Sequence, residues 1–198
     1  MKSLIVLACF VAFAAAEGMA RRETLINDDW VKEINSKAKT WTASTEQGSL
    51  NGATVDHFKS LCGVKHTENA PKVERKRYTN TDIPAEFDSA VKWPHCKSIN
   101  HIRDQSACGS CWAFGAAEAM SDRYCTYGGA ANITIAANDL LACCQSCGMG
   151  CGGGEPIAAW QYWNNIGLVD NFCDPYPFPH CEHHVQPAHP KYPPCPSK

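Results

Sequence analysis

A helix that begins at a reactive cysteine is the feature that most limits how this 198-residue chain can fold. Ser110 is a favourable N-cap residue, so Cys111 would lie in the first helical turn. The positive end of a helix dipole stabilises a thiolate, the form of cysteine that acts as a nucleophile. The apolar residues that follow recur at helical spacing and predict one buried face: Trp112, Ala113, Phe114, Ala116, Ala117 and Met120.

Cys111 could instead be half of a disulfide, because the chain holds 13 cysteines. Such a content indicates an oxidising compartment, where disulfides persist. We favour the nucleophile, since the neighbouring residues fit one catalytic signature together: Gln105, Cys108, Gly109, Ser110 and Trp112.

The N-terminus reads as a secretory signal peptide over residues 1–16. Lys2 precedes an apolar run that ends in three alanines before Glu17, and this run is too short to span a membrane. A net charge of −2 without a long basic run gives no indication of nucleic-acid binding. Asn132 begins a glycosylation sequon. We therefore expect the secretory pathway, ending in a lysosome-like compartment or outside the cell.

Residues 17–82 divide into a helical part and a linker. Asp28 and Asp29 could cap a helix with an apolar face that extends to Trp41, and residues 58–63 form a second apolar patch. Residues 65–82 are polar and basic without a hydrophobic period, which indicates an exposed, cleavable linker, with an ordinary surface loop as the alternative. The tail from Pro175 onward is rich in Pro and His and reads as a loop.

The chain from 83 to 198 resembles the cathepsin B group of the papain-like cysteine proteases. The resemblance rests on the signature around Cys111 and on three later motifs, at residues 139–144, 151–154 and 181–184, with Trp41 and residues 61–63 added from the upstream part. It implies an α+β, papain-like fold of two domains. Residues 1–16 would be the signal peptide and 17–82 an inhibitory propeptide. Residues 83–198 would form the mostly helical left domain and a loop, with most of the β-barrel right domain missing.

The resemblance also implies roles for residues around the cleft. Cys111 would be the nucleophile, and the Gln105 amide would stabilise the oxyanion together with the Cys111 backbone N–H. Gly153 and Gly154 would let the substrate backbone approach closely, although a simple turn of glycines is the alternative. Glu155 would line the second specificity pocket and favour basic side chains.

Two residues depart from the family pattern. Ser106 stands where the family usually has Gly, and Gly152 stands where it usually has Asn. Both lie near the cleft and could alter its shape, but neither is a reacting group.

Transferring the family's disulfides leaves Cys143 and Cys173 without partners, because those would lie beyond Lys198. The catalytic His and Asn of the family also come roughly 130–150 residues after the cysteine, which again falls beyond Lys198. We therefore interpret the chain as a C-terminally truncated precursor that is inactive alone. The alternative is a secreted, disulfide-rich binding or decoy protein. The implied pairs are Cys96–Cys125, Cys108–Cys151, Cys144–Cys147 and Cys181–Cys195.

Residues 181–195 resemble the family's occluding loop. His183 and His184 would bind the C-terminal carboxylate of a substrate, giving carboxydipeptidase activity beside endopeptidase activity. Asp104 would anchor the loop through His183. Residues 180–184 also offer ligand types that suit zinc, but adjacent histidines do not match the usual finger spacing, so we expect no metal and no other cofactor. The expected partners are peptide and protein substrates and the chain's own propeptide, and we expect a monomer.

Overall fold

The computed structural model describes residues 24–47, 50–66, 83–128 and 132–178. The predicted signal peptide, most of the linker and the loop at 181–195 lie outside these residues. Among the described residues the chain divides into two compact units, with the boundary between Leu61 and Cys62. No helix of the described part is long and apolar enough to cross a membrane.

The first unit contains the helices α2 (Asp28–Lys37) and α3 (Val55–Leu61). Asn27 caps α2 through its side-chain oxygen, which accepts a hydrogen bond from the Trp30 N–H at 3.0 Å. Asp28 and Asp29 lie in the first turn, where acidic side chains favour the helix dipole. The predicted cap at Asp28 and Asp29 is therefore wrong, because the N-cap is Asn27, one residue earlier.

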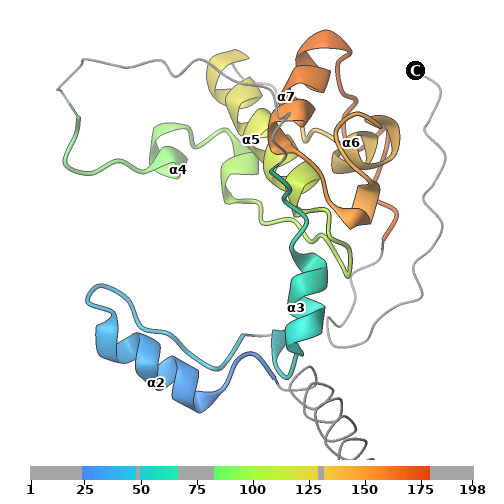
Figure 1. The fold of residues 1–198 in the computed structure, drawn as a ribbon. Coiled ribbons are helices and arrows are strands. Elements are labelled where there is room, and N and C mark those ends of the chain that lie inside the picture. Colours follow the sequence, from blue (N-terminus) through green and yellow to red (C-terminus); the bar gives the residue numbers. More distant parts are fainter. Residues whose placement is uncertain (1–23, 48–49, 67–82, 129–131, 179–198) are drawn as a thin grey trace, which may run out of the picture. The chain divides into compact units, whose positions relative to one another are not determined.

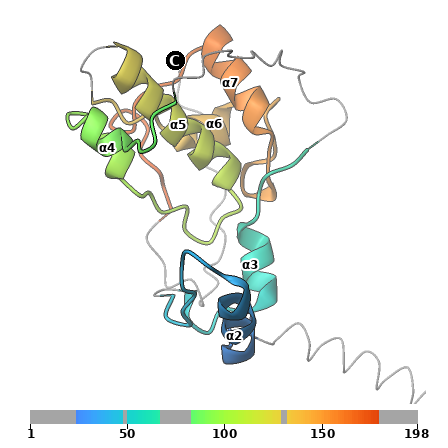
Figure 2. The ribbon, with the colours of Figure 1, turned by 90° about the vertical axis from the view of Figure 1, so that its left-hand side faces the viewer.

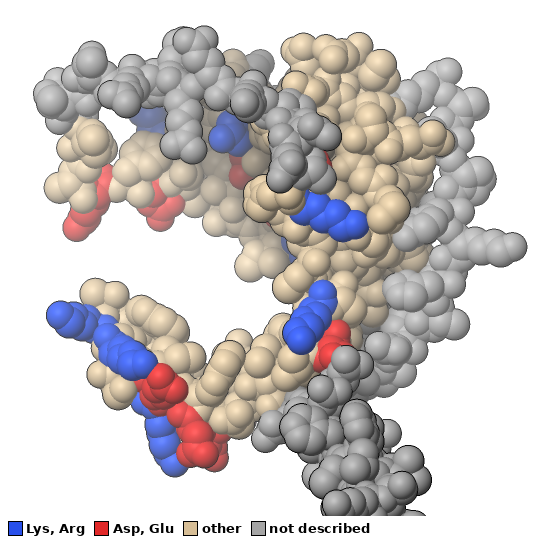
Figure 3. All heavy atoms as spheres, in the orientation of Figure 1, with Lys and Arg blue, Asp and Glu red and all other residues tan. Residues whose placement is uncertain are grey.

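The helix also ends before the predicted apolar face is complete. The chain turns back after Lys37, and Asn35 holds the returning segment by two hydrogen bonds to Ala43. Trp41 consequently lies outside α2 and is 61% exposed. Figure 3 shows acidic and basic side chains next to one another in this part of the chain. The ion pairs on α2 are Lys32–Asp29 and Lys37–Glu33. Exposed pairs of this kind add little stability.

The second unit is built around α5 (Cys111–Gly128), which packs against α6 (Ala137–Cys143) and α7 (Pro156–Asn165), as Figures 1 and 2 show. It also holds α4 (Ser89–Lys92) and the short 3-10 helices η2 (Lys97–Asn100) and η3 (Gly150–Gly152). The predicted helix after Cys111 is confirmed, because all the apolar residues of its face are buried: Trp112, Ala113, Phe114, Ala116, Ala117 and Met120.

Three disulfides hold this unit together, and they are the pairs that the resemblance implies within the described residues. Cys96–Cys125 joins the segment after α4 to α5, Cys108–Cys151 joins the turn before Cys111 to η3, and Cys144–Cys147 closes a tight turn after α6. Closing the 29-residue loop between Cys96 and Cys125 restricts the unfolded chain, which is worth about 3–4 kcal/mol in the chain-entropy description.

The two cysteines expected to be left over differ in the structure. Cys173 is an exposed thiol, but Cys143 is disulfide-bonded, so the expectation that Cys143 has no partner is wrong. Cys181 and Cys195, the fourth implied pair, lie outside the described residues. The error arises because pairing depends on which sulfur atoms come within bonding distance, and family order along the chain does not determine that distance.

Candidate active site

Cys111 is the first residue of α5 and is partly buried. The Ser110 carbonyl accepts the first helical hydrogen bond from the Phe114 N–H at 3.0 Å, so Ser110 occupies the predicted N-cap position. Its hydroxyl shares a 2.8 Å hydrogen bond with the Tyr176 hydroxyl. The Cys111 thiol therefore lies at the N-terminus of α5.

Gln105 lies in a tight turn just before this helix. Its side-chain Nε2 donates to the Cys108 carbonyl at 2.7 Å, which uses one of the two amide hydrogens. Ser106 is unusual in this turn, because it is buried and has a φ of 56°. Its N–H donates to the Asp104 carboxylate at 2.6 Å. A positive φ favours glycine, which gives a physical reason for the family's usual residue at this position.

Gly153 and Gly154 form the wall that faces the helix N-terminus. Gly153 has a φ of 101°, which a side chain would strain. A Cβ atom on Gly154 would lie 2.6 Å from the Trp112 ring, so the backbone can reach this position only without a side chain. The Trp112 indole N–H donates to the Gly150 carbonyl at 3.1 Å and fixes the ring. The glycines therefore serve close backbone approach as well as turning.

A segment of the predicted propeptide lies along this wall. The Gly154 N–H donates to the Gly63 carbonyl at 2.8 Å, and the Lys65 N–H donates to the Gly154 carbonyl at 2.9 Å, so the two backbones form a parallel bridge. The Gly63 N–H in turn donates to the Cys111 Sγ at 3.0 Å. The thiol therefore already has a peptide backbone hydrogen-bonded on top of it.

Gly63 fits this place because it has no side chain. A Cβ atom built on it would overlap the Gly109 carbonyl. Sequence reasoning noted residues 61–63 as a motif but could not place them, because Gly63 and Cys111 are 48 residues apart. Lys65 also belongs to this paired segment, so the predicted linker cannot begin as early as residue 65.

Comparison with known proteins agrees with this arrangement. Residues 83–195, more than half of the chain, match the sequence profile of the family described as papain family cysteine protease. The chain belongs to the papain family. It is 40% identical to the cathepsin B-like cysteine proteinase 6 of Caenorhabditis elegans, over 99% of this chain and 59% of that relative. It is 48% identical to a cathepsin B-like cysteine proteinase of Schistosoma japonicum, over 87% of this chain and 53% of that relative.

Solved structures of the papain family show the same fold. A procathepsin B from Trypanosoma congolense matches with a TM-score of 0.75 and 38% identity, over 87% of this chain and 58% of that one. A procathepsin L2 from Tenebrio molitor matches with a TM-score of 0.64 at 21% identity, which supports the fold alone. The chain spans about half the length of the curated relatives it matches. The described part of the second unit therefore corresponds to the mostly helical domain of a papain-like protease.

Arg103 fixes the segment that leads to Gln105, and sequence reasoning missed this role. Its guanidinium donates to the Ile135 carbonyl at 2.9 Å and to the Asn171 side chain at 3.2 Å, and it lies 4.8 Å from the centre of the Phe114 ring. Burial lowers the pKa of Arg103, while the charge of Glu118 opposes this shift. Burial likewise raises the pKa of Glu118, against the effect of Arg103. The two charges therefore partly compensate each other behind the site.

The remaining predicted residues are only partly described. Glu155 is buried at the N-cap position of α7, and its N–H donates to the Cys147 carbonyl at 2.8 Å. Asn132 is exposed, and its side-chain oxygen accepts from the Lys97 N–H at 2.8 Å. His183 and His184 lie outside the described residues, so the predicted contact of His183 with Asp104 stays a prediction.

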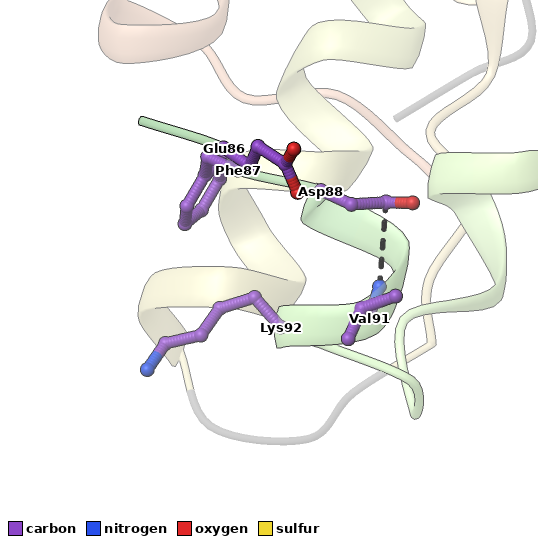
Figure 4. A pocket seen from close by; sticks show the side chains of 5 residues that line it. All are labelled: Glu86, Phe87, Asp88, Val91 and Lys92. Atoms are coloured by element: carbon purple, nitrogen blue, oxygen red, sulfur yellow. Dashed lines mark hydrogen bonds between the residues drawn. The ribbon is translucent and has the colours of Figure 1, made fainter. Parts of the chain in front are cut away.

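A hollow lies beside α4, and its lining residues are separate from the candidate site residues described above. It has a volume of about 580 Å³ and is lined by Glu86, Phe87, Asp88, Val91 and Lys92, as Figure 4 shows. Asp88 accepts hydrogen bonds from the Ala90 and Val91 N–H groups, so its carboxylate serves as the cap of α4. None of the predicted catalytic residues lines this hollow, so it is not a candidate active site.

Proposed function

We propose that this protein is the precursor of a cathepsin B-like cysteine proteinase that hydrolyses peptide bonds with Cys111 as the nucleophile. The observation that carries the proposal is the backbone of residues 63–65, which hydrogen-bonds to Gly154 on one side and to the Cys111 Sγ on the other. A site that accepts an extended peptide backbone against a thiol is suited to cleaving peptide bonds. Papain-family membership and the likeness to the procathepsin B structure support the same conclusion.

In the reaction, the Cys111 thiolate attacks the carbonyl carbon of the scissile bond and forms a C–S bond. The carbonyl oxygen becomes an oxyanion, to which the Cys111 backbone N–H and the Gln105 amide would donate. Collapse of this intermediate breaks the C–N bond, and the leaving amine takes a proton from an imidazolium. Water then releases the acyl group from the sulfur. The resemblance assigns the imidazole and its orienting Asn to positions beyond Lys198.

Residues 17–82 would act as the inhibitory propeptide, because residues 62–65 cover the thiol. An exchange of Gly63 for Ala tests this. The added Cβ would overlap the Gly109 carbonyl, so the segment must shift away from Cys111. We expect iodoacetamide to alkylate Cys111 at least about tenfold faster in Gly63→Ala, since each 1.4 kcal/mol lost from the contact opens the site tenfold more often.

The control for this experiment is Gly115→Ala, in which the added Cβ meets open space on the exposed side of α5. The exposed Cys173 thiol provides an internal reference rate. Equal alkylation of Cys111 in Gly63→Ala and in the unaltered chain would contradict the inhibitory role of residues 62–65.

The proposed carboxydipeptidase activity depends on the pairing of His183 with Asp104. Asp104→Asn removes the carboxylate charge but keeps an oxygen that can accept from the Ser106 N–H. In the full-length proteinase we expect this change to lower dipeptide release and raise endopeptidase activity, because the loop loses an ionic anchor. The measurement is the ratio of the two activities on matched peptides at acidic pH. An unchanged ratio would show that Asp104 does not hold the loop.

Transit through the secretory pathway, to a lysosome-like compartment or to the outside, is also part of the proposal. Asn132 is exposed, and the Lys97 N–H occupies only its side-chain oxygen, so a glycan on its nitrogen is compatible with the fold. We expect protein from secretory cells to lose the mass of one N-glycan on treatment with an N-glycanase. The Asn132→Gln variant should be secreted without the mass of this glycan. A glycan that persists in the variant would mean that another residue is modified.

The experiment that tests the proposed function is an activity assay of the full-length, processed protein on quenched peptides. We expect hydrolysis that is lost after alkylation of thiols. The alternative, a secreted binding or decoy protein without catalysis, predicts no hydrolysis at all. Thiol alkylation would then leave the result of the assay unchanged, so the assay separates the two functions.

A further inference from the structure

The hydroxyl of Tyr176 joins two parts of the candidate active site that come from different turns. It donates a hydrogen bond to the Gln105 carbonyl at 2.8 Å and shares a second one, also 2.8 Å, with the Ser110 hydroxyl. Gln105 carries the proposed oxyanion donor, and Ser110 directly precedes the nucleophile. Tyr176 itself lies 71 residues from Gln105 in the chain.

The donors in this chain of hydrogen bonds follow from the number of protons. A phenol has one hydrogen, and Tyr176 gives it to the Gln105 carbonyl. The Ser110 hydroxyl must therefore donate to the Tyr176 oxygen. Consecutive hydrogen bonds that point the same way strengthen one another, so the link from Ser110 to Gln105 acts as one unit.

The ring of Tyr176 is itself held in place. Phe114 contacts it edge-on at 4.7 Å between ring centres, and Phe178 does so at 5.1 Å. Phe114 in turn lies under the guanidinium of Arg103, which is tied to the Ile135 carbonyl and to Asn171. The hydroxyl thus sits at a fixed point and does not have to be ordered during the reaction.

We propose that Tyr176 is a positioning residue for peptide hydrolysis, whose hydroxyl fixes the Gln105 amide relative to the Cys111 thiol. The proposal rests on the function proposed above and adds a residue to it. Its hydroxyl bonds to the Gln105 backbone and to the Ser110 side chain, so Tyr176 acts through the two turns that carry the reacting groups. Oxyanion donors are effective only when they are placed to within a fraction of an ångström, and a displacement of 1 Å can cost about 100-fold in rate.

The test is Tyr176→Phe, which removes the hydroxyl and leaves the ring contacts. In the full-length processed enzyme we expect kcat to fall about tenfold with KM nearly unchanged, because one hydrogen bond of the link is lost and the oxyanion donor is misplaced. Tyr127→Phe is the matched control, since its side chain is 89% exposed and its hydroxyl is not part of the site. A rise in KM without a change in kcat would overturn the proposal.

A double-mutant cycle separates positioning from general stability. If Tyr176 acts through the Gln105 amide, Tyr176→Phe should lower kcat by less than about twofold once Gln105→Ala has removed that amide. A merely structural role would lower kcat about equally in both backgrounds, and that result would overturn the proposal.

Hydrogen exchange tests the same contact by a measurement that does not depend on catalysis. In Tyr176→Phe, the backbone amides of residues 105–111 should exchange at least about fivefold faster, while those of α7 keep their rate, because the loss is local. Unchanged exchange at 105–111 would contradict the positioning role. Inactivity of the unaltered full-length enzyme would instead contradict the proposed function, so the two failures are distinguishable.

Discussion

Cys111→Ala should lower peptide hydrolysis by the full-length proteinase about 10⁵–10⁶-fold, the loss expected when the nucleophile of a covalent mechanism is removed. Cys111 begins α5, and its sulfur accepts a hydrogen bond from the Gly63 N–H. No other described thiol is placed to replace it. The measurement is kcat/KM on one quenched peptide, with the residual rate compared with that of the buffer.

Tyr127→Phe provides the control, because it changes a side chain on the same helix that is 89% exposed. We expect this variant to keep its activity within about threefold, as surface substitutions usually have small effects. Undiminished hydrolysis by Cys111→Ala would refute the assignment of the nucleophile, whatever the result for Tyr127→Phe.

Gln105→Ala should give the second largest loss, about 10²–10³-fold in kcat, as for the removal of one oxyanion donor. KM should change little, because the amide stabilises charge that develops only in the transition state. Gln145→Ala, which truncates an exposed glutamine after α6, is the control and should be silent. A loss of less than about threefold in Gln105→Ala would mean that its amide does not serve the oxyanion.

The helix that carries Cys111 could be predicted because its signal is local. Its apolar residues recur at helical spacing, and α5 buries them all, from Trp112 to Met120. The close approach of Gly154 to the Trp112 ring also agrees with the sequence, since three consecutive glycines mark a place where another backbone or ring comes near. Local periodicity and residue size are sufficient for these features.

The features that could not be predicted depend on contacts between distant residues. Ser110 is a good N-cap by its type, yet its hydroxyl bonds to Tyr176, 66 residues away. The apolar face predicted to reach Trp41 is interrupted because Asn35 bonds to Ala43 and turns the chain back. Cys143 forms a disulfide that family order did not suggest. In each case a tertiary contact decided between two options that the local sequence allowed equally.

The most direct test of the covalent mechanism is to trap the acyl-enzyme. The full-length processed protein is mixed with a peptide ester that deacylates slowly, quenched with acid within the first turnover, and mapped by mass spectrometry. We predict one acyl group per molecule, attached as a thioester to the peptide that contains Cys111. Turnover without any acyl group on Cys111, or with the acyl group on another residue, would contradict the proposed function.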